Sequence, residues 1–206
     1  MKKHQLDTEG FQAGVPSAWV ADELSRRAFL LRGGAALAVS CALPALPLLQ
    51  GEEFDPESAL SAFSDKQAKL LSAIQEHLFP KDVESPGALE INALAFLGFV
   101  ITRPDFATGS RNFIINGIQS VREASMERFD RGFEDLDAAG KESLLRYLAD
   151  RTRWGRNWIS LLLYYIFEAL LADPVYGCNP DGIGWKWLEH QPGFPRPPPD
   201  KIYSRL

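Results

Sequence analysis

The chain has 206 residues, a net charge of −5 and apolar side chains at 46% of its positions. This length and composition fit one globular domain of ordinary size, and they exclude a largely disordered or multiply membrane-spanning chain. The acidic balance argues against a nucleic acid partner, because binding phosphates requires a basic surface.

A pair of arginines lies in a short motif near the N-terminus, followed by an uncharged run from Gly33 to Leu49. Paired arginines ahead of an apolar run resemble a twin-arginine export signal, which directs folded proteins across a membrane. We therefore predict that residues 1–49 are an export leader and that the body is periplasmic. The residues of the signal are Ser25, Arg26, Arg27, Phe29 and Leu30.

The leader is either cleaved or retained. Its apolar run contains Pro44 and Pro47 and is barely long enough to span a bilayer, which favours cleavage. No sharp small-residue cleavage site is present, so retention as an N-terminal anchor is the alternative. Loss of Cys41 with the leader would leave Cys178 alone and unable to form an internal disulfide. A single thiol fits a body that folds in the reducing cytosol before export.

The body begins with a polar stretch over 50–63, which we interpret as a linker. Ser64 and Gln67 then form a capping-box pattern before an amphipathic helix predicted over 65–79, which Pro80 stops. A loop with two prolines follows over 80–87.

Four further helices are expected after this loop. An almost wholly apolar stretch predicts a helix over 88–101 that is buried on most sides, and the longest amphipathic helix is predicted over 110–131. Asp137 predicts the cap of a shorter helix, and a last, aromatic-rich helix is expected over 158–171. Five helices without alternating strands predict an all-α fold, a single compact domain over 64–190. The proline-rich residues 191–206 predict an extended tail.

The sequence lacks the patterns of common catalytic and cofactor sites. Its three histidines form no zinc-protease or di-iron pattern, and Cys178 cannot supply a haem-attachment motif. No glycine-rich phosphate loop follows a predicted strand. The chain is therefore expected to carry no catalytic residue, cofactor or metal ligand.

An alternative hypothesis keeps a chemical role for this chain. A free-standing exported enzyme or ligand-binding protein would use His77, Asp82, Asp181 and Lys186, the polar groups best suited to acid–base work or ligand binding. The sequence does not decide whether the chain is an enzyme.

The most informative part of the body is its end, residues 173–188, which is rich in Gly, Pro, Asn, Asp and Trp. Such a composition predicts a rigid, irregular segment. Two roles are open to it: it wraps its own core, or it presents aromatic anchors to a partner.

Three stretches carry a resemblance to a known family: the leader, the loop and the C-terminal segment. In the loop they are Phe79-Pro80-Lys81-Asp82 and Ser85-Pro86-Gly87-Ala88, and near the end they are Asp173-Pro174, Tyr176-Gly177, Asn179 and Asp181 to Lys186. In these the chain resembles the gluconate 2-dehydrogenase subunit 3 family. Cys178, where the family usually has Gly, and the lengthened ending from Glu189 depart from its pattern.

This resemblance implies a non-catalytic small subunit of an exported dehydrogenase for sugars, sugar acids or alcohols. The implied partner is a large FAD-bearing subunit of the glucose-methanol-choline type, often joined by a cytochrome c subunit that carries haem c. The small subunit would supply the export signal and escort the flavoprotein, with membrane association through the complex or a retained leader. Expected contacts are Pro80, Asp82, Pro86, Gly87, Tyr176, Asn179, Asp181, Gly182, Gly184, Trp185, Lys186 and Trp187.

Overall fold

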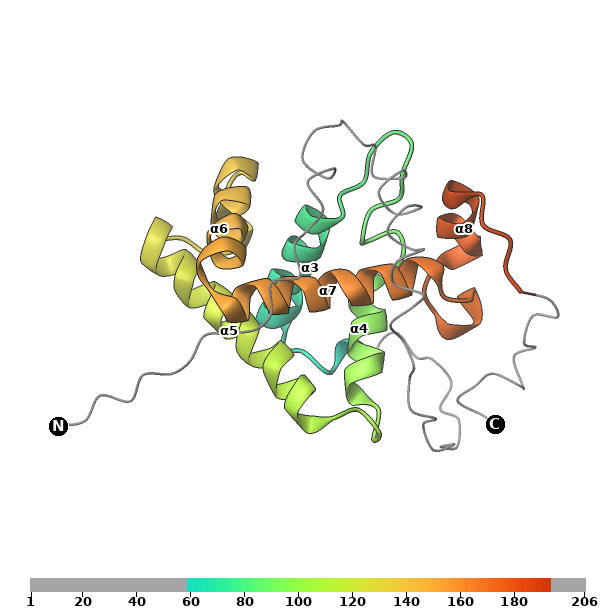
Figure 1. The fold of residues 1–206 in the computed structure, drawn as a ribbon, viewed down its shortest axis with the longest axis horizontal. Coiled ribbons are helices and arrows are strands. Elements are labelled where there is room, and N and C mark those ends of the chain that lie inside the picture. Colours follow the sequence, from blue (N-terminus) through green and yellow to red (C-terminus); the bar gives the residue numbers. More distant parts are fainter. Residues whose placement is uncertain (1–58, 194–206) are drawn as a thin grey trace, which may run out of the picture. The chain divides into compact units, whose positions relative to one another are not determined.

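The computed structural model describes residues 59–193, which form packed helices without a strand in that range (Figure 1). Their elements are α3 (Asp65–Leu78), α4 (Ala93–Thr102), α5 (Thr108–Phe129), η2 (Phe133–Asp135), α6 (Ala138–Arg151), α7 (Arg153–Leu171), η3 (Pro174–Tyr176), η4 (Pro180–Gly182) and α8 (Ile183–Leu188). The predicted all-α fold with a single compact domain is confirmed.

Several predictions fall outside the described residues. The export motif Ser25, Arg26, Arg27, Phe29 and Leu30, most of the linker and the tail beyond residue 193 lie there. The proposed boundaries of leader, linker, domain and tail therefore stay predictions.

Helix α3 begins where its sequence predicts and ends one residue earlier than predicted. Ser64 Oγ accepts from the Gln67 amide, and Gln67 Oε1 accepts from the Ser64 amide at 2.9 Å, which completes the capping box. The helix ends at Leu78, just before Phe79-Pro80. Its buried face carries Leu71 and Ile74, both without exposed area.

Helix α4 begins later than the sequence predicts. The apolar stretch was expected to be helical from Ala88, but residues 88–92 form a turn and α4 begins at Ala93. The reason is Asn92, whose φ of 57° places it in the left-handed region and interrupts the helix. The turn brings Leu89 to the surface, whereas Leu97 in α4 is fully buried.

Helix α7 is the central element, and α3, α4, α5, α6 and α8 all contact it (Figure 1). Trp158 of α7 is fully buried and its Nε1 donates to the Ile114 carbonyl of α5 at 3.0 Å. Gly117 makes this approach possible, because a Cβ there would lie 1.9 Å from the same Nε1. The helix starts at Arg153, ahead of the predicted residue 158, because Thr152 caps it by accepting from the Gly155 amide.

The C-terminal segment is only partly irregular. It makes two short 3-10 turns and then forms α8, a helix that the sequence analysis did not predict. None of the helices among the described residues is long and apolar enough to cross a membrane.

Candidate partner interface

The loop 80–87 and the C-terminal segment, far apart in sequence, meet in the fold. The Phe79 ring packs at a steep angle against Trp187 of α8, with ring centres 6.0 Å apart. It also packs against Phe167 of α7 at 6.4 Å. The two stretches that carry the family resemblance are therefore neighbours on one side of α7.

Asn179 ties this region together. It is fully buried, with φ of 49°, and its Nδ2 donates to the Ala172 carbonyl at 3.0 Å. Its Oδ1 accepts from the Gly184 amide at 2.7 Å, and its own amide donates to the Ile91 carbonyl at 3.1 Å. One residue thus joins the end of α7, the start of α8 and the turn 88–92.

A second asparagine makes the same connection from the other side. Asn92 Nδ2 donates to the Gly177 carbonyl at 3.1 Å. Hydrogen bonds with donors in both stretches therefore hold the turn 88–92 and the C-terminal segment together.

Helix α8 packs closely on the end of α7. A Cβ on Gly184 would lie 2.2 Å from the Leu170 carbonyl oxygen, so only glycine allows this approach. Gly182 has φ of 65°, which also favours glycine, and Trp185 Nε1 donates to the Leu171 carbonyl at 2.7 Å. These motif residues are buried and hold α8 in place.

The loop 80–87 is held by its own polar groups. Asp82 Oδ1 accepts from the amides of Glu84 and Ser85, both at 2.8 Å. Lys81 pairs with Glu90, and this hydrogen bond raises the pKa of Lys81 and lowers the pKa of Glu90. The Glu90 carboxylate also accepts from the amide of buried Gly87.

A structured loop of this kind presents its exposed side chains in a defined geometry. Val83 is fully exposed among them, while Pro86 is buried and Pro80 is half-buried.

Three members of the predicted interface are exposed: Asp82 lies in the loop 80–87, and the other two lie at α8. Asp181 and Lys186 are exposed and line a shallow, open hollow with Pro174, Gly182 and Trp185. Tyr176 and Trp187 are half-buried. A partner that approaches this face meets these side chains, whereas Asn179, Gly182 and Gly184 shape the surface from beneath.

The residues of the alternative enzyme hypothesis have different neighbours. His77 Nε2 lies 3.0 Å from Glu142 Oε2 of α6, and this hydrogen bond lowers the pKa of Glu142. Asp82 accepts from the amides of its own loop, and Asp181 and Lys186 line the hollow beside α8. The described residues contain no group of three or more His, Cys, Asp or Glu side chains placed to bind a metal.

Burial raises the pKa of three titratable groups in or beside α7. It raises the pKa of the fully buried Cys178 thiol to about 12 and that of Tyr165 to about 12. Burial also raises the pKa of Glu168. Since the thiolate is the reactive form of cysteine, Cys178 is a structural side chain here.

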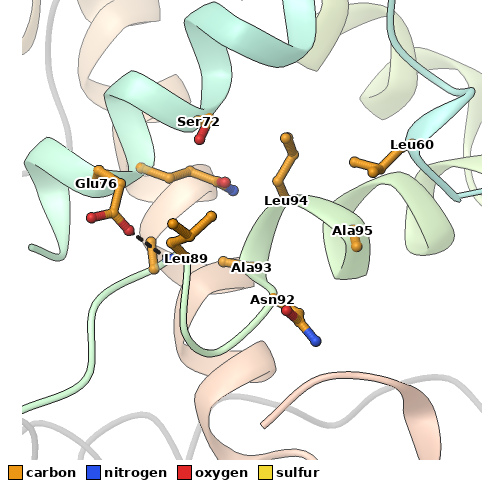
Figure 2. Close-up of a pocket in the computed structure, with 10 residues that line it drawn as sticks. Leu60, Ser72, Glu76, Leu89, Asn92, Ala93, Leu94 and Ala95 are labelled. Atoms are coloured by element: carbon orange, nitrogen blue, oxygen red, sulfur yellow. Dashed lines mark hydrogen bonds between the residues drawn. The ribbon is translucent and has the colours of Figure 1, made fainter. Parts of the chain in front are cut away.

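The structure also reveals a groove that the sequence analysis missed. It has a volume of about 160 Å³ and lies between α3, α4 and the turn 88–92 (Figure 2). Its lining residues are Leu60, Ser72, Gln75, Glu76, Ala88, Leu89, Asn92, Ala93, Leu94 and Ala95. No spacing in the sequence indicates it, because Leu89 belongs to an apolar run that predicts a buried helix.

One polar group in the groove is unpaired. Gln75 is 1% exposed, and its Nε2 has no hydrogen-bond partner among the described residues. An unsatisfied buried donor costs about 1–3 kcal/mol of stability.

The fold and this surface define a class: an all-α domain with a structured loop and C-terminal segment on one side of its central helix. Residues 65–193, more than half of the chain, match the family model described as Gluconate 2-dehydrogenase subunit 3. The chain belongs to this family, as its motifs indicated. No curated protein and no solved structure matches the chain.

Proposed function

We propose that the chain is the non-catalytic small subunit of an exported, FAD-dependent dehydrogenase complex of the glucose-methanol-choline type. The family match over residues 65–193 carries this proposal, since the family is described as a subunit of a dehydrogenase. A subunit of this kind implies a larger catalytic partner. In the proposal FAD is bound by that partner, and electrons pass to a cytochrome c subunit or the respiratory chain.

The surface around the loop 80–87 supports a stabilising role. Val83 and Leu89 are exposed there although both are large and apolar, and the backbone that carries them is fixed by hydrogen bonds. Contact with a partner would remove their apolar surface from water, which is worth roughly 25 cal/mol per Å². The free energy gained would stabilise the complex and, with it, the flavoprotein.

The twin-arginine motif supports an escort role. A flavoprotein must bind FAD and fold before it crosses the membrane, so it needs an export route for folded proteins. In our proposal the motif Ser25, Arg26, Arg27, Phe29 and Leu30 provides this route for both subunits. The complex is then periplasmic and associates with the membrane through its other subunits or a retained leader.

Purification of the tagged full-length chain from an extract of its own host tests the proposal. We expect a larger protein to co-purify in a fixed ratio and to show flavin absorbance. Recovery of the chain alone would contradict the proposal. Substrate turnover by the isolated chain, abolished by His77→Ala, would support a free-standing enzyme instead.

A further inference from the structure

We infer that the groove between α3, α4 and the turn 88–92 binds an apolar side chain of the larger subunit together with a backbone carbonyl group beside it. This inference rests on the proposed function and names a contact that the family motifs do not include.

The walls are largely apolar, and two of their leucines are exposed. Six of the ten lining residues are Leu or Ala, and Leu89 is 68% exposed while Leu60 is 39% exposed. Single exposed leucines are ordinary on protein surfaces. Here two of them line one small groove, and the fully exposed Val83 stands on the adjoining loop. Apolar side chains gathered in this way mark a protein contact more often than an open surface.

The polar groups that line the groove select what enters it. Glu76 Oε1 accepts from the Leu89 amide, as Figure 2 shows, and Asn92 Nδ2 donates to the Gly177 carbonyl. Both groups therefore already have partners within the chain. The Gln75 Nε2 donor has none among the described residues, although its side chain is buried and lines the groove. The Nε2 atom itself has almost no accessible surface, so the Gln75 side chain must rotate into the groove before an acceptor from outside can complete it. The acceptor next to any side chain of a protein partner is a backbone carbonyl.

The size and position of the groove favour a protein occupant over a small ligand. Its volume of about 160 Å³ is below the roughly 300–1,000 Å³ of typical ligand pockets, and it suits one or two side chains. The groove adjoins the loop 80–87 through Ala88, and its wall residue Asn92 is bonded to the C-terminal segment. It is therefore continuous with the surface proposed to meet the larger subunit. A central apolar anchor surrounded by weaker contacts is how such interfaces are commonly built.

A charge in the groove tests the inference. The full-length chain and its variants are titrated against the isolated flavoprotein subunit of the co-purified complex. Leu89→Asp is expected to weaken binding at least tenfold, because a carboxylate cannot be buried against apolar side chains. Met126→Asp, at a site 46% exposed on α5, is the matched control and should bind like the unchanged chain. Circular dichroism and thermal unfolding establish that both variants fold, and Leu89→Ala replaces the charged variant if it does not.

Gln75→Leu separates binding from folding. In the free chain it removes an unpaired buried amide, so the melting temperature should stay the same or rise. In the complex it removes the donor for the carbonyl of the partner, so affinity should fall severalfold. A loss of stability together with an unchanged affinity would show that the amide serves only the fold and would overturn this part of the inference.

The remaining outcomes distinguish the inference from the proposed function. Wild-type affinity in both Leu89→Asp and Gln75→Leu would overturn the groove contact but leave the subunit role intact. Light scattering that shows a homodimer, broken by Leu89→Asp without any effect on flavoprotein binding, would assign the groove to a second copy and overturn the inference. Failure of the unchanged chain to bind any flavoprotein would remove the proposed function and, with it, the inference.

Discussion

Asn179 shows why a polar side chain can be essential to the interior of a small helical domain. Its side-chain amide donates to Ala172 and accepts from Gly184, while its backbone amide reaches Ile91. No apolar residue of similar size supplies both a donor and an acceptor. A residue of the family motif thus helps to hold α8 in position.

We expect Asn179→Ala to lower the free energy of unfolding by about 3 kcal/mol, because it removes the partners of the buried Gly184 amide and the partly buried Ala172 carbonyl. The left-handed backbone at this position adds to the loss, since Ala tolerates it less well than Asn. Urea unfolding followed by circular dichroism measures the change. Asn157→Ala, at an exposed site on α7, serves as the control and should change the value little. Equal values for the two variants would show that the bonds of Asn179 do not stabilise the fold.

The raised pKa of Glu168 predicts that the stability of the fold depends on pH. Burial raises its pKa above the ordinary value of 4.5, so the folded state holds this proton more tightly than the unfolded state. The stability that binding of this proton contributes to the folded state is therefore fully present below pH 4.5. It is lost as the pH rises through the folded-state pKa. Glu168→Gln stays neutral, so it should be more stable than the unchanged chain at about pH 7 and equally stable at about pH 4.

Urea titrations of Glu168→Gln at several pH values measure this difference. Glu127→Gln, at an exposed site on α5, is the matched control and should track the unchanged chain throughout. A stability difference for Glu168→Gln that does not vary with pH would contradict ionisation of Glu168 as its cause.

Local sequence signals predicted those helices that carry them. The capping box at Ser64 and the cap at Asp137 correctly place the starts of α3 and α6, since these side chains satisfy amides of the first turn whatever the rest of the fold does. Helix α8 has no such signal. With 6 residues it is too short to form alone, and it depends on the bonds from Asn179 to Gly184 and from Trp185 to Leu171.

The candidate site was predictable only in part, for a related reason. The sequence pointed to the loop 80–87 and the C-terminal segment, but the hydrogen bond from Asn179 to Ile91, which ties the segment to the turn that follows the loop, is a long-range contact. The groove could not be predicted at all. Leu89 and Leu97 lie in the same apolar run, yet one is 68% exposed and the other is fully buried. Only the left-handed turn at Asn92 separates them, and hydrophobic periodicity does not detect such a turn.

Across the domain, the residues that hold the fold together are distinct from those proposed to contact the partner. The buried motif residues Asn179, Gly184 and Trp185 hold α8 on α7, so they act within the chain. The exposed Val83 and Leu89 have no such role in the core. Under the proposed function these exposed side chains bind the larger subunit in the cytoplasm, before export.

Export of both subunits should therefore depend on the leader of this chain. Substitution of both Arg26 and Arg27 by Lys should remove both subunits, and the flavin absorbance, from the periplasmic fraction. The reason is that the flavoprotein crosses the membrane only when it is bound to the small subunit. Arg32→Lys lies outside the pair and should leave both subunits periplasmic. Leu89→Asp keeps the signal but weakens binding, so the small subunit should cross while the flavoprotein stays behind. A flavoprotein that reaches the periplasm with the paired-lysine variant would show that it has its own signal, and the escort role would then be wrong.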